Sequence, residues 1–402
     1  MTSEWHEVPL RELVGYISKG IAPSYAEEAS ETTIRVLNQK CNRNFRISYG
    51  DSRLHDTLKK KVPPERYVKP DDILINSTGA GTAGRIAQIE DVPSATTIDG
   101  HMILIRSNGK VTQKFLGYAL KAHQWEVLQL DEGSTGQTEL NRDRLLDEIM
   151  INYPVSFDEQ NAIVGTLESI DRKLIVNKEI NDNLEQQAQA IYHERFETVS
   201  PNDLPSDWRI VTLGEVATIS NKSFNPLKEP EILLEHYSIP AFDEARFPVF
   251  ELSTSIKSNK FIIDASCFMI SKLNPTTKRV WKPYCLTGNA VCSTEFIVYK
   301  AKDQSITDFL YSVIDSGSFS DFMCSHVTGS TGSRQRTTPS DTLSYELILP
   351  SEDELAEFQS LVSPMYAQMR INAIENDKLK RLRDSLLPKL MSGEIDVSSV
   401  HL

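Results

Sequence analysis

The chain has 402 residues, of which 40% are hydrophobic and 25% charged, as in globular proteins with two or three domains. No run approaches the ~18 apolar residues of a membrane span, and the N-terminus lacks the basic and apolar parts of a signal peptide, so the cytosol is the expected location. The five cysteines form no Cys-x-x-Cys pair and the eight histidines no His-Glu-x-x-His motif, which argues against a disulfide framework and against a metal centre.

Residues 1–155 are expected to form a first mixed α/β domain. Its strands are predicted at residues 73–75 and 102–105, and a helix is predicted at residues 115–130. The glycines of residues 79–84 fit a Gly-x-Gly-x-x-Gly pattern. Because the alternating residues 85–89 that follow predict a strand and not a helix, we expect a glycine hairpin here and no dinucleotide site.

A long helix is predicted from Phe157 to about Phe196, within the segment of residues 156–200. Its apolar residues recur every three or four positions, which is the seam of a coiled coil. In the middle of the helix the seam positions are occupied by Asn177 and Asn181. Such a helix is about 60 Å long at 1.5 Å per residue, which exceeds the ~34 Å turn of B-DNA.

Residues 201–350 repeat the order of signals in the first domain. Trp5 recurs as Trp208, 203 positions later, and the Gly-Ser-Thr-Gly sequence that begins at Gly133 recurs at Gly329, 196 positions later. The expected strands are residues 261–263, 268–270 and 296–299, and the expected helix is residues 306–322. A repeat of about 200 residues predicts pseudo-two-fold symmetry, which suits a partner that itself repeats, such as duplex DNA.

The last segment, residues 351–402, repeats the long helix. A shift of 195 positions brings an apolar residue to nearly every seam position, and brings Asn372 and Asn376 to the two Asn positions of the first helix. In an antiparallel pair Asn177 would face Asn376. Asn181 would then face Asn372. An Asn pair in an apolar seam penalises other registers, so we interpret these residues as fixing the register; solvated Asn side chains without a special role are the alternative.

The net charge of −13 is unusual for a protein that binds DNA. More than half of the deficit lies in the helical segments, since residues 157–200 carry −5 and residues 351–402 carry −3. Basic clusters stand out in the two domains, and each is either a DNA contact or an ordinary solvated face. An acidic chain of this kind is expected to need partner subunits to neutralise DNA phosphates.

The order of these signals resembles that of the specificity subunits of Type I restriction–modification enzymes, over nearly the whole chain. The resemblance rests on Trp208-x-x-x-x-Leu213-Gly214-Glu215-Val216, on residues 72–75 with the glycine loop, on Gly133-Ser134-Thr135-Gly136-Gln137, on Tyr153-Pro154 leading to Asp158-Glu159-Gln160, and on the ending at residues 383–395. The second copy departs from the pattern, because Pro350 is followed by Ser351 and no Glu-Gln pair, and because residues 271–275 are less glycine-rich.

The resemblance implies an α+β fold with two similar mixed α/β target-recognition domains. They are separated and followed by two long antiparallel coiled-coil helices, in an internal pseudo-two-fold repeat. It implies a non-catalytic subunit that reads the two halves of a gapped double-stranded DNA target. The expected partners are two modification subunits, which would bind S-adenosylmethionine and methylate adenine, with a restriction or translocase subunit as a further candidate. This chain itself is expected to bind no cofactor.

Base reading needs side chains that fork onto base edges, Arg or Lys on guanine and Asn or Gln on adenine. In the first domain the candidates are Arg43, Asn44, Arg46, Ser77, Thr78 and Gln137, and in the second they are Lys272, Asn274, Lys278, Arg279, Lys282, Arg334, Gln335 and Arg336. Lys59, Lys60 and Lys61 are suited to phosphate contacts.

Two other classes of function stay open on the residues alone. A protein-interaction adaptor would use the same coiled coil and twin domains, and the acidic net charge favours it. An enzyme, such as a sugar- or nucleotide-modifying transferase, would need a convergent polar pocket. The sequence has no Gly-x-x-x-x-Gly-Lys-Ser/Thr loop, no Asn/Asp-Pro-Pro-Tyr/Phe motif and no legible Ser/His/Asp or Cys/His arrangement, which favours a reader over a catalyst.

Overall fold

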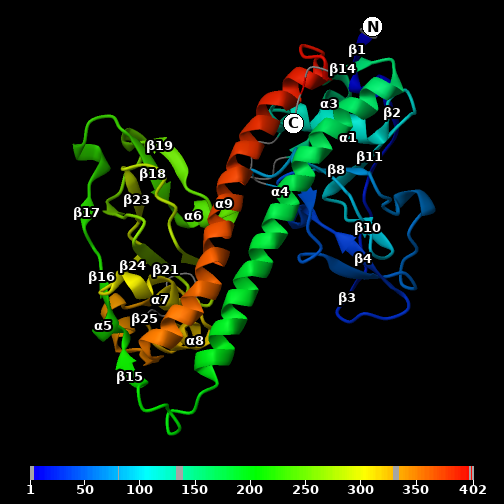
Figure 1. The fold of residues 1–402 in the computed structure, drawn as a ribbon. Coiled ribbons are helices and arrows are strands. Elements are labelled where there is room, and N and C mark those ends of the chain that lie inside the picture. The colour runs from blue at the N-terminus through cyan, green and yellow to red at the C-terminus, as the bar shows by residue number, and fades with distance from the viewer. Residues whose placement is uncertain (1–3, 80, 133–138, 329–334, 398–399, 401–402) are drawn as a thin grey trace. The chain divides into compact units, whose positions relative to one another are not determined.

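The chain is divided into two compact units. The structure, a computed structural model, describes residues 4–79, 81–132, 139–328, 335–397 and 400. The first unit comprises Met1–Arg172 and Leu379–Leu402, and the second comprises Lys173–Lys378. Each unit holds one mixed α/β domain and parts of two long helices, α4 (Phe157–Tyr192) and α9 (Glu352–Met391) (Figure 1). The unit boundaries therefore fall inside the helices, whereas the predicted division gives each helix a segment of its own.

An antiparallel sheet in the order β2-β11-β8-β9 forms the centre of the first domain. Its strands are β2 (Val14–Lys19), β11 (Met102–Ser107), β8 (Ile73–Asn76) and β9 (Ile86–Gln88). Successive side chains of a strand point to opposite faces: in β8, Ile73 and Ile75 join one apolar cluster and Leu74 joins another. Because both faces are buried, residues 73–75 of β8 and 102–105 of β11 form uninterrupted apolar runs in the sequence.

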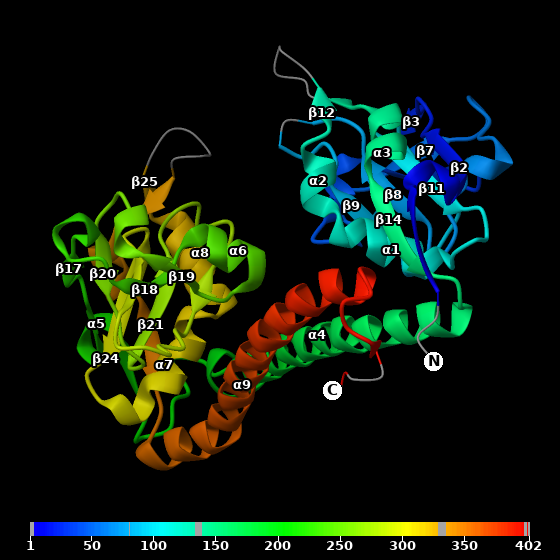
Figure 2. The same ribbon diagram turned by 90° about the horizontal axis from the view of Figure 1, so that it is seen from above.

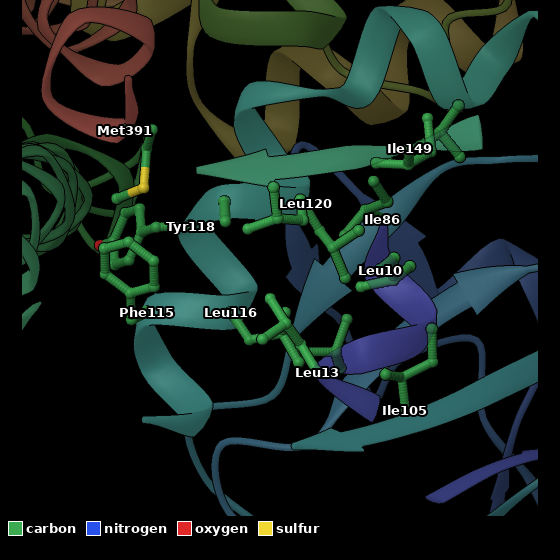
Figure 3. Close-up of a cluster of buried hydrophobic side chains, with 14 of the residues drawn as sticks. Leu10, Leu13, Ile86, Ile105, Phe115, Leu116, Tyr118, Leu120, Ile149 and Met391 are labelled. Carbon is green, nitrogen blue, oxygen red and sulfur yellow. The ribbon is translucent and has the colours of Figure 1, made fainter. Parts of the chain in front are cut away.

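Helices cover one face of this sheet, and a second sheet covers the other. On the first face α1 (Gln113–Ala122) supplies Phe115, Leu116 and Leu120, which pack against Leu10 and Leu13 (Figure 3). The smaller helices α2 (Gln124–Leu128) and α3 (Arg142–Glu148) lie on the same cluster. The second sheet has the order β10-β4-β7-β3, with strands β10 (Thr96–Ile98), β4 (Thr33–Leu37), β7 (Arg53–Asp56) and β3 (Tyr25–Ala26).

The second domain repeats this architecture (Figure 2). Its central sheet has the order β16-β24-β21-β22, with strands β16 (Ala217–Ile219), β24 (Phe296–Ala301), β21 (Cys267–Ser271) and β22 (Val280–Trp281). Its second sheet has the order β17-β20-β23-β18-β19, with strands β17 (Ser223–Phe224), β20 (Lys260–Ile262), β23 (Ala290–Ser293), β18 (Leu233–Tyr237) and β19 (Val249–Leu252). The matching strand orders of the two central sheets confirm the predicted internal repeat.

The predicted strands are present in both domains, but each predicted domain helix is divided into two. The helix expected at residues 115–130 is split into α1 and α2 at His123, where the backbone (φ −91°, ψ 13°) leaves the helical region. The helix expected at residues 306–322 is split into α7 (Thr307–Ile314) and α8 (Gly317–Ser325). Ser316 begins the second of these, because its side chain accepts a hydrogen bond from the Phe319 amide.

A two-stranded sheet joins the ends of each domain. In the first domain β1 (Trp5–Pro9) pairs with β14 (Met150–Pro154), and in the second β15 (Arg209–Thr212) pairs with β27 (Glu346–Leu349). A tryptophan beside each first strand packs against the end of a long helix. The Trp5 ring lies against Gly393, after α9, and Trp5 Nε1 donates to Glu159 of α4 at 3.2 Å. In the second unit the Trp208 and Phe196 rings are 5.7 Å apart.

The two long helices contribute to both apolar cores. Ile163 of α4 packs in the cluster of the first domain, and Tyr192, at the other end of α4, packs in that of the second. The order is reversed in α9, where Phe358 belongs to the second cluster and Met391 to the first, beside Tyr118 and Phe115 in Figure 3. This is the arrangement of an antiparallel pair. The predicted fold class, α+β with two similar domains and two long antiparallel coiled-coil helices, is confirmed.

Candidate nucleic-acid interface

The predicted contacts Arg43, Asn44 and Arg46 lie on a tight hairpin. Its strands are β5 (Asn42–Arg43) and β6 (Arg46–Ile47), in which Arg43 pairs with Arg46. Asn44 and Phe45 at the turn have φ values of 52° and 61°, as a type I′ hairpin requires. Arg43 and Asn44 are exposed at the tip. Arg46 lies 3.7 Å from the Glu90 carboxylate, and because both side chains are largely exposed this ion pair is weak.

The hairpin is fixed to one edge of the central sheet. Asn42 is fully buried, and its Nδ2 donates to Asn76 Oδ1 at 3.2 Å and to the Arg85 carbonyl at 2.8 Å. Phe45 pairs with Ala87 of β9. The hairpin therefore lies at the edge of the central sheet where β8 ends and β9 begins. Ser77 and Thr78, the predicted contacts that follow β8, lie at the same edge.

Ser77 and Thr78 follow β8 at this edge and differ in accessibility. Ser77 is fully buried, and its hydroxyl donates to the Gly100 carbonyl at 3.4 Å. Thr78 is half-buried, and its hydroxyl lies 2.8 Å from Nδ1 of the exposed His101. Of the two hydroxyls, that of Thr78 is therefore the one that a ligand can reach.

The glycine loop after Thr78 is the predicted hairpin. β9 pairs antiparallel with β8, as the alternating sequence indicates. Gly84 has a φ of 83°, and a Cβ there would lie 2.9 Å from the Val127 carbonyl, so this glycine allows α2 to pack on the loop. The turn between β8 and β9 and the packing of α2 therefore account for glycines of the Gly-x-Gly-x-x-Gly pattern.

Lys59, Lys60 and Lys61 form an exposed basic run after β7. Lys59 Nζ is 3.9 Å from the Asp56 carboxylate, and Lys60 Nζ donates to the Ala22 carbonyl at 2.8 Å. Neither interaction neutralises a buried acid, so these lysines are available to phosphates. Their role as phosphate contacts stays a prediction.

Three predicted cations of the second domain are bound by carboxylates of the same domain. Lys278 Nζ lies 2.8 Å from the Asp315 carboxylate, and Arg279 binds Asp243 through Nε and Nη2 at 2.6 and 2.9 Å. Lys282 pairs with Asp308. Because Asp315 is buried and the Arg279 side chain is only 12% exposed, these cations stabilise the domain. A DNA contact by any of them stays a prediction.

The remaining candidates of the second domain gather where β21 ends. The Asn274 amide donates to the Gln335 carbonyl at 2.9 Å, and the Thr337 amide donates to the Lys272 carbonyl at 3.2 Å. Arg336 is bound to Glu295 through two nitrogens. Gln137 and Arg334 lie outside the described residues.

The second domain has no counterpart of the Arg43–Arg46 hairpin among its described residues. Where the hairpin follows β4 in the first domain, α6 (Ile239–Ala245) follows β18 in the second. α6 ends at Arg246, in a left-handed conformation with a φ of 50°. Arg246 Nη2 lies 2.7 Å from Glu185 of α4 and donates to the Tyr311 hydroxyl at 2.9 Å. This segment therefore anchors the domain to the long helix.

In the first unit a buried carboxylate joins the domain to both long helices. Asp171 of α4 accepts hydrogen bonds from Lys121 at 3.0 Å, from Arg383 of α9 at 2.9 Å and from the Tyr118 hydroxyl at 2.9 Å. Burial raises the pKa of the Asp171 carboxyl, but Lys121 and Arg383 outweigh burial and bring the pKa below its usual range. Burial also lowers the pKa of Lys121.

The four seam asparagines are hydrogen-bonded across the helix pair, within the second unit. Asn177 Nδ2 donates to Asn376 Oδ1 at 2.9 Å, and Asn372 Nδ2 donates to Asn181 Oδ1 at 2.8 Å. These are the two pairs that the sequence places opposite one another in an antiparallel register. The other amides donate to carbonyls of the opposite helix, Asn181 to Met369 at 3.1 Å and Asn376 to Leu174 at 3.3 Å. Their role in fixing the register stays a prediction.

The side chains that line the two sheet edges include several that the sequence did not single out, namely Lys19, His101, Glu139 and Glu295. They come together only through the strand order, so no local motif announces them. Within the described part of the chain, no group of three or more His, Cys, Asp or Glu is arranged to bind a metal ion. None of the helices described is both long and apolar enough to cross a membrane.

Known proteins match the first half of the chain by a family model and nearly the whole chain by sequence. Residues 2–186 match the family model of the Type I restriction modification DNA specificity domain. The MjaIX Type I restriction enzyme specificity subunit of Methanocaldococcus jannaschii is 25% identical over 384 residues, which cover 88% of this chain and 84% of that protein. The HindI specificity subunit of Haemophilus influenzae is 32% identical over 93 residues, 23% of this chain and 20% of that protein.

A solved structure shares the fold. The Type I restriction–modification S subunit from M. genitalium has a TM-score of 0.58 and 16% identity, over 97% of this chain and 96% of that chain. Two mixed α/β domains and two long antiparallel helices are thus a fold that this chain shares with a solved S subunit. Residues 2–186 thus carry a Type I restriction modification DNA specificity domain, and the resemblance of the chain to the specificity subunits of these systems is confirmed.

Proposed function

We propose that this chain reads the two halves of a gapped duplex DNA target, one half with each domain, as a non-catalytic subunit in the cytosol. The observation that carries the proposal is the repeat of one sheet edge. In the first domain Arg43, Asn44 and Thr78 are accessible at the edge where β8 ends. In the second, Lys272 and Gln335 are half-exposed where β21 ends. Both edges offer the Arg, Lys, Asn and Gln groups that bind base edges.

The proposed partners are two modification subunits, which would bring S-adenosylmethionine and transfer its methyl group to adenine. A restriction or translocase subunit is a further candidate. The net charge of −13 supports an assembly, because an acidic chain neutralises few phosphates by itself. The two long helices, related by the same repeat as the domains, would offer two equivalent docking surfaces.

The test is to express the chain with its modification subunit and to map methylated adenines genome-wide by single-molecule sequencing. A gapped two-part motif, methylated on both strands, is the expected result. An active modification subunit that co-purifies with the chain and leaves no motif would favour the protein-interaction adaptor, as would complex formation without salt-dependent DNA binding.

Matched variants assign one half of the motif to the first domain. We expect Arg43→Ala with Asn44→Ala to relax the bases of one half, since removal of a bidentate hydrogen-bond pair to a base reduces discrimination by about 1–3 kcal/mol. Lys110→Ala is the control, because Lys110 is equally basic but follows β11 at the opposite end of the sheet. Relaxation of both halves, or of neither, would contradict the assignment.

A further inference from the structure

Two strand pairs are attached to the two sheet edges at equivalent places. They are β12 (Asp131–Glu132) with β13 (Glu139–Leu140), and β25 (Val327–Thr328) with β26 (Arg336–Thr337). Glu139 pairs with Thr78, after β8, and Arg336 pairs with Leu273, after β21. In both, the next residue is buried: Leu140 is 2% exposed and Thr337 is 1% exposed. The first residues of β13 and β26 thus occupy the same position in the repeat.

At this position the two domains have opposite charges. Glu139 forms an ion pair with Lys19, the last residue of β2. Arg336 binds Glu295, the residue before β24, with Nε–Oε2 and Nη2–Oε1 distances of 3.0 and 3.1 Å. In the first domain the strand pair supplies the acid and the sheet the base. In the second the strand pair supplies the base and the sheet the acid.

We propose that Glu139 and Arg336 are positioning residues for DNA reading, which fix the strand pairs β12–β13 and β25–β26 to the sheet edges through ion pairs of opposite polarity. This inference rests on the proposed function. It changes the role predicted for Arg336 from a base contact to a group that acts through the position of β25–β26. Two of its guanidinium nitrogens are already occupied by Glu295 in the geometry of a bidentate pair.

The exposure of these ion pairs makes the inference testable. The side chains of Lys19 and Glu139 are 42% and 57% exposed, and those of Arg336 and Glu295 are 42% and 28% exposed. Exposed ion pairs contribute little to folding stability. Substitutions should therefore leave the domains folded and change only the geometry of the strand pair. An effect on DNA reading can then be distinguished from a loss of the fold.

The experiment compares Arg336→Glu, Glu295→Arg and the double charge swap, each in the complex of the full chain with its modification subunit. Binding is measured on the target duplex and on two duplexes in which one or the other half is scrambled. We expect each single variant to lose about tenfold in discrimination at one half only, and the double swap to regain most of it, since a charged hydrogen bond is rebuilt. Lys19→Glu, Glu139→Lys and their double swap should act on the other half.

The alternatives give different results. If Arg336 reads a base directly, the double swap will bind as weakly as Arg336→Glu alone, and the positioning role is overturned. If a single variant lowers the unfolding temperature and weakens both halves together, the ion pair serves the fold only, and the inference fails as well. If the wild-type complex does not distinguish the target from the scrambled duplexes, it is the proposed function that fails.

Discussion

Asn177 and Asn376 are hydrogen-bonded across the two long helices at 2.9 Å, and one turn away Asn372 and Asn181 are bonded at 2.8 Å in the opposite direction. Asn177 and Asn372 are 1% and 4% exposed, so one amide of each pair is removed from water, and Asn181 and Asn376 are half-buried. A slip by one turn would leave buried amides unpaired and would cost about 1–3 kcal/mol for each. We therefore expect two such pairs to select one register more strongly than an apolar seam would.

The first prediction concerns these pairs. Asn177→Leu alone should destabilise the chain by about 1–3 kcal/mol, because Asn376 loses its buried donor. Asn177→Leu with Asn376→Leu should recover this loss or exceed wild-type stability, since an apolar pair suits the seam. Urea unfolding of the two single variants and the double variant measures the coupling. Equal destabilisation by the single and the double variants would show that the pair does not act as a unit.

The second prediction concerns the carboxylate of Asp171. Its side chain is 16% exposed and contacts Lys121 and Arg383. Asp171→Asn should destabilise the chain by about 3 kcal/mol, because Lys121 would be left buried without its acid and Arg383 would keep only the exposed Asp384. The control is Asp384→Asn, which removes the exposed partner of the same Arg383 and should cost at most about 1 kcal/mol. The denaturant midpoints of the two variants measure the difference. Equal losses of stability in both variants would contradict a stabilising role of the buried Asp171.

The third prediction concerns pH. Burial raises the pKa of Asp315 from 3.8 to about 6, and the nearby Lys278 reduces this shift without cancelling it. Because the pKa is higher in the folded state than in the unfolded chain, the neutral acid stabilises the fold. This contribution is complete below about pH 4 and is lost as the pH rises through about 6. Asp315→Asn should therefore flatten the pH dependence of the unfolding temperature between these values. The exposed Asp321→Asn is the control and should leave the slope as in wild type.

The fourth prediction separates the lysines that we expect to bind phosphates from one that is bound to a buried carboxylate. Replacing Lys59, Lys60 and Lys61 by Ala should weaken DNA binding by the complex for all sequences alike. It should also reduce the slope of log K against log salt, by ~0.9 for each phosphate that is no longer neutralised. Lys278→Ala should leave the slope unchanged and lower the unfolding temperature, because Lys278 is the partner of the buried Asp315. A salt slope that changes only in Lys278→Ala would reverse the two assignments.

Much of the fold was predictable because its signals are periodic. The seam of the long helices and the repeat of about 200 residues are visible in the sequence, and Asn177 and Asn376 follow from the antiparallel register. The strands were found because sheets buried on both faces leave continuous apolar runs. The breaks at His123 and Ser316 were not predicted. The capping side chain of Ser316 inside an apolar pattern gives a weak local signal, and His123 ends α1 without a side-chain cap.

The site was less predictable, because a charge in the sequence does not reveal its partner. Lys278 and Arg279 are residue types that commonly contact DNA. They are bound instead by Asp315 and Asp243, which lie 37 and 36 positions away in the sequence. Glu139 has no motif, and only the strand order brings it to Lys19. The replacement of the Arg43 hairpin by α6 was also hidden, since both segments have ordinary lengths and polar residues.

The two tryptophans make similar contacts at the starts of the two domains. Trp208 packs against Phe196, which precedes it along the chain, whereas Trp5 packs against Gly393, which is near the other end of the sequence. Each domain therefore begins on the end of a long helix. The contact of Trp5 with Gly393 brings the start of the first domain to the end of α9, as a peptide connection between them would. Joining the segment after Gly393 to the one before Trp5, and opening the chain between Phe196 and Trp208, would give a circular permutant with the same contacts. The contacts of the two tryptophans are therefore compatible with either order of the two domains along the chain.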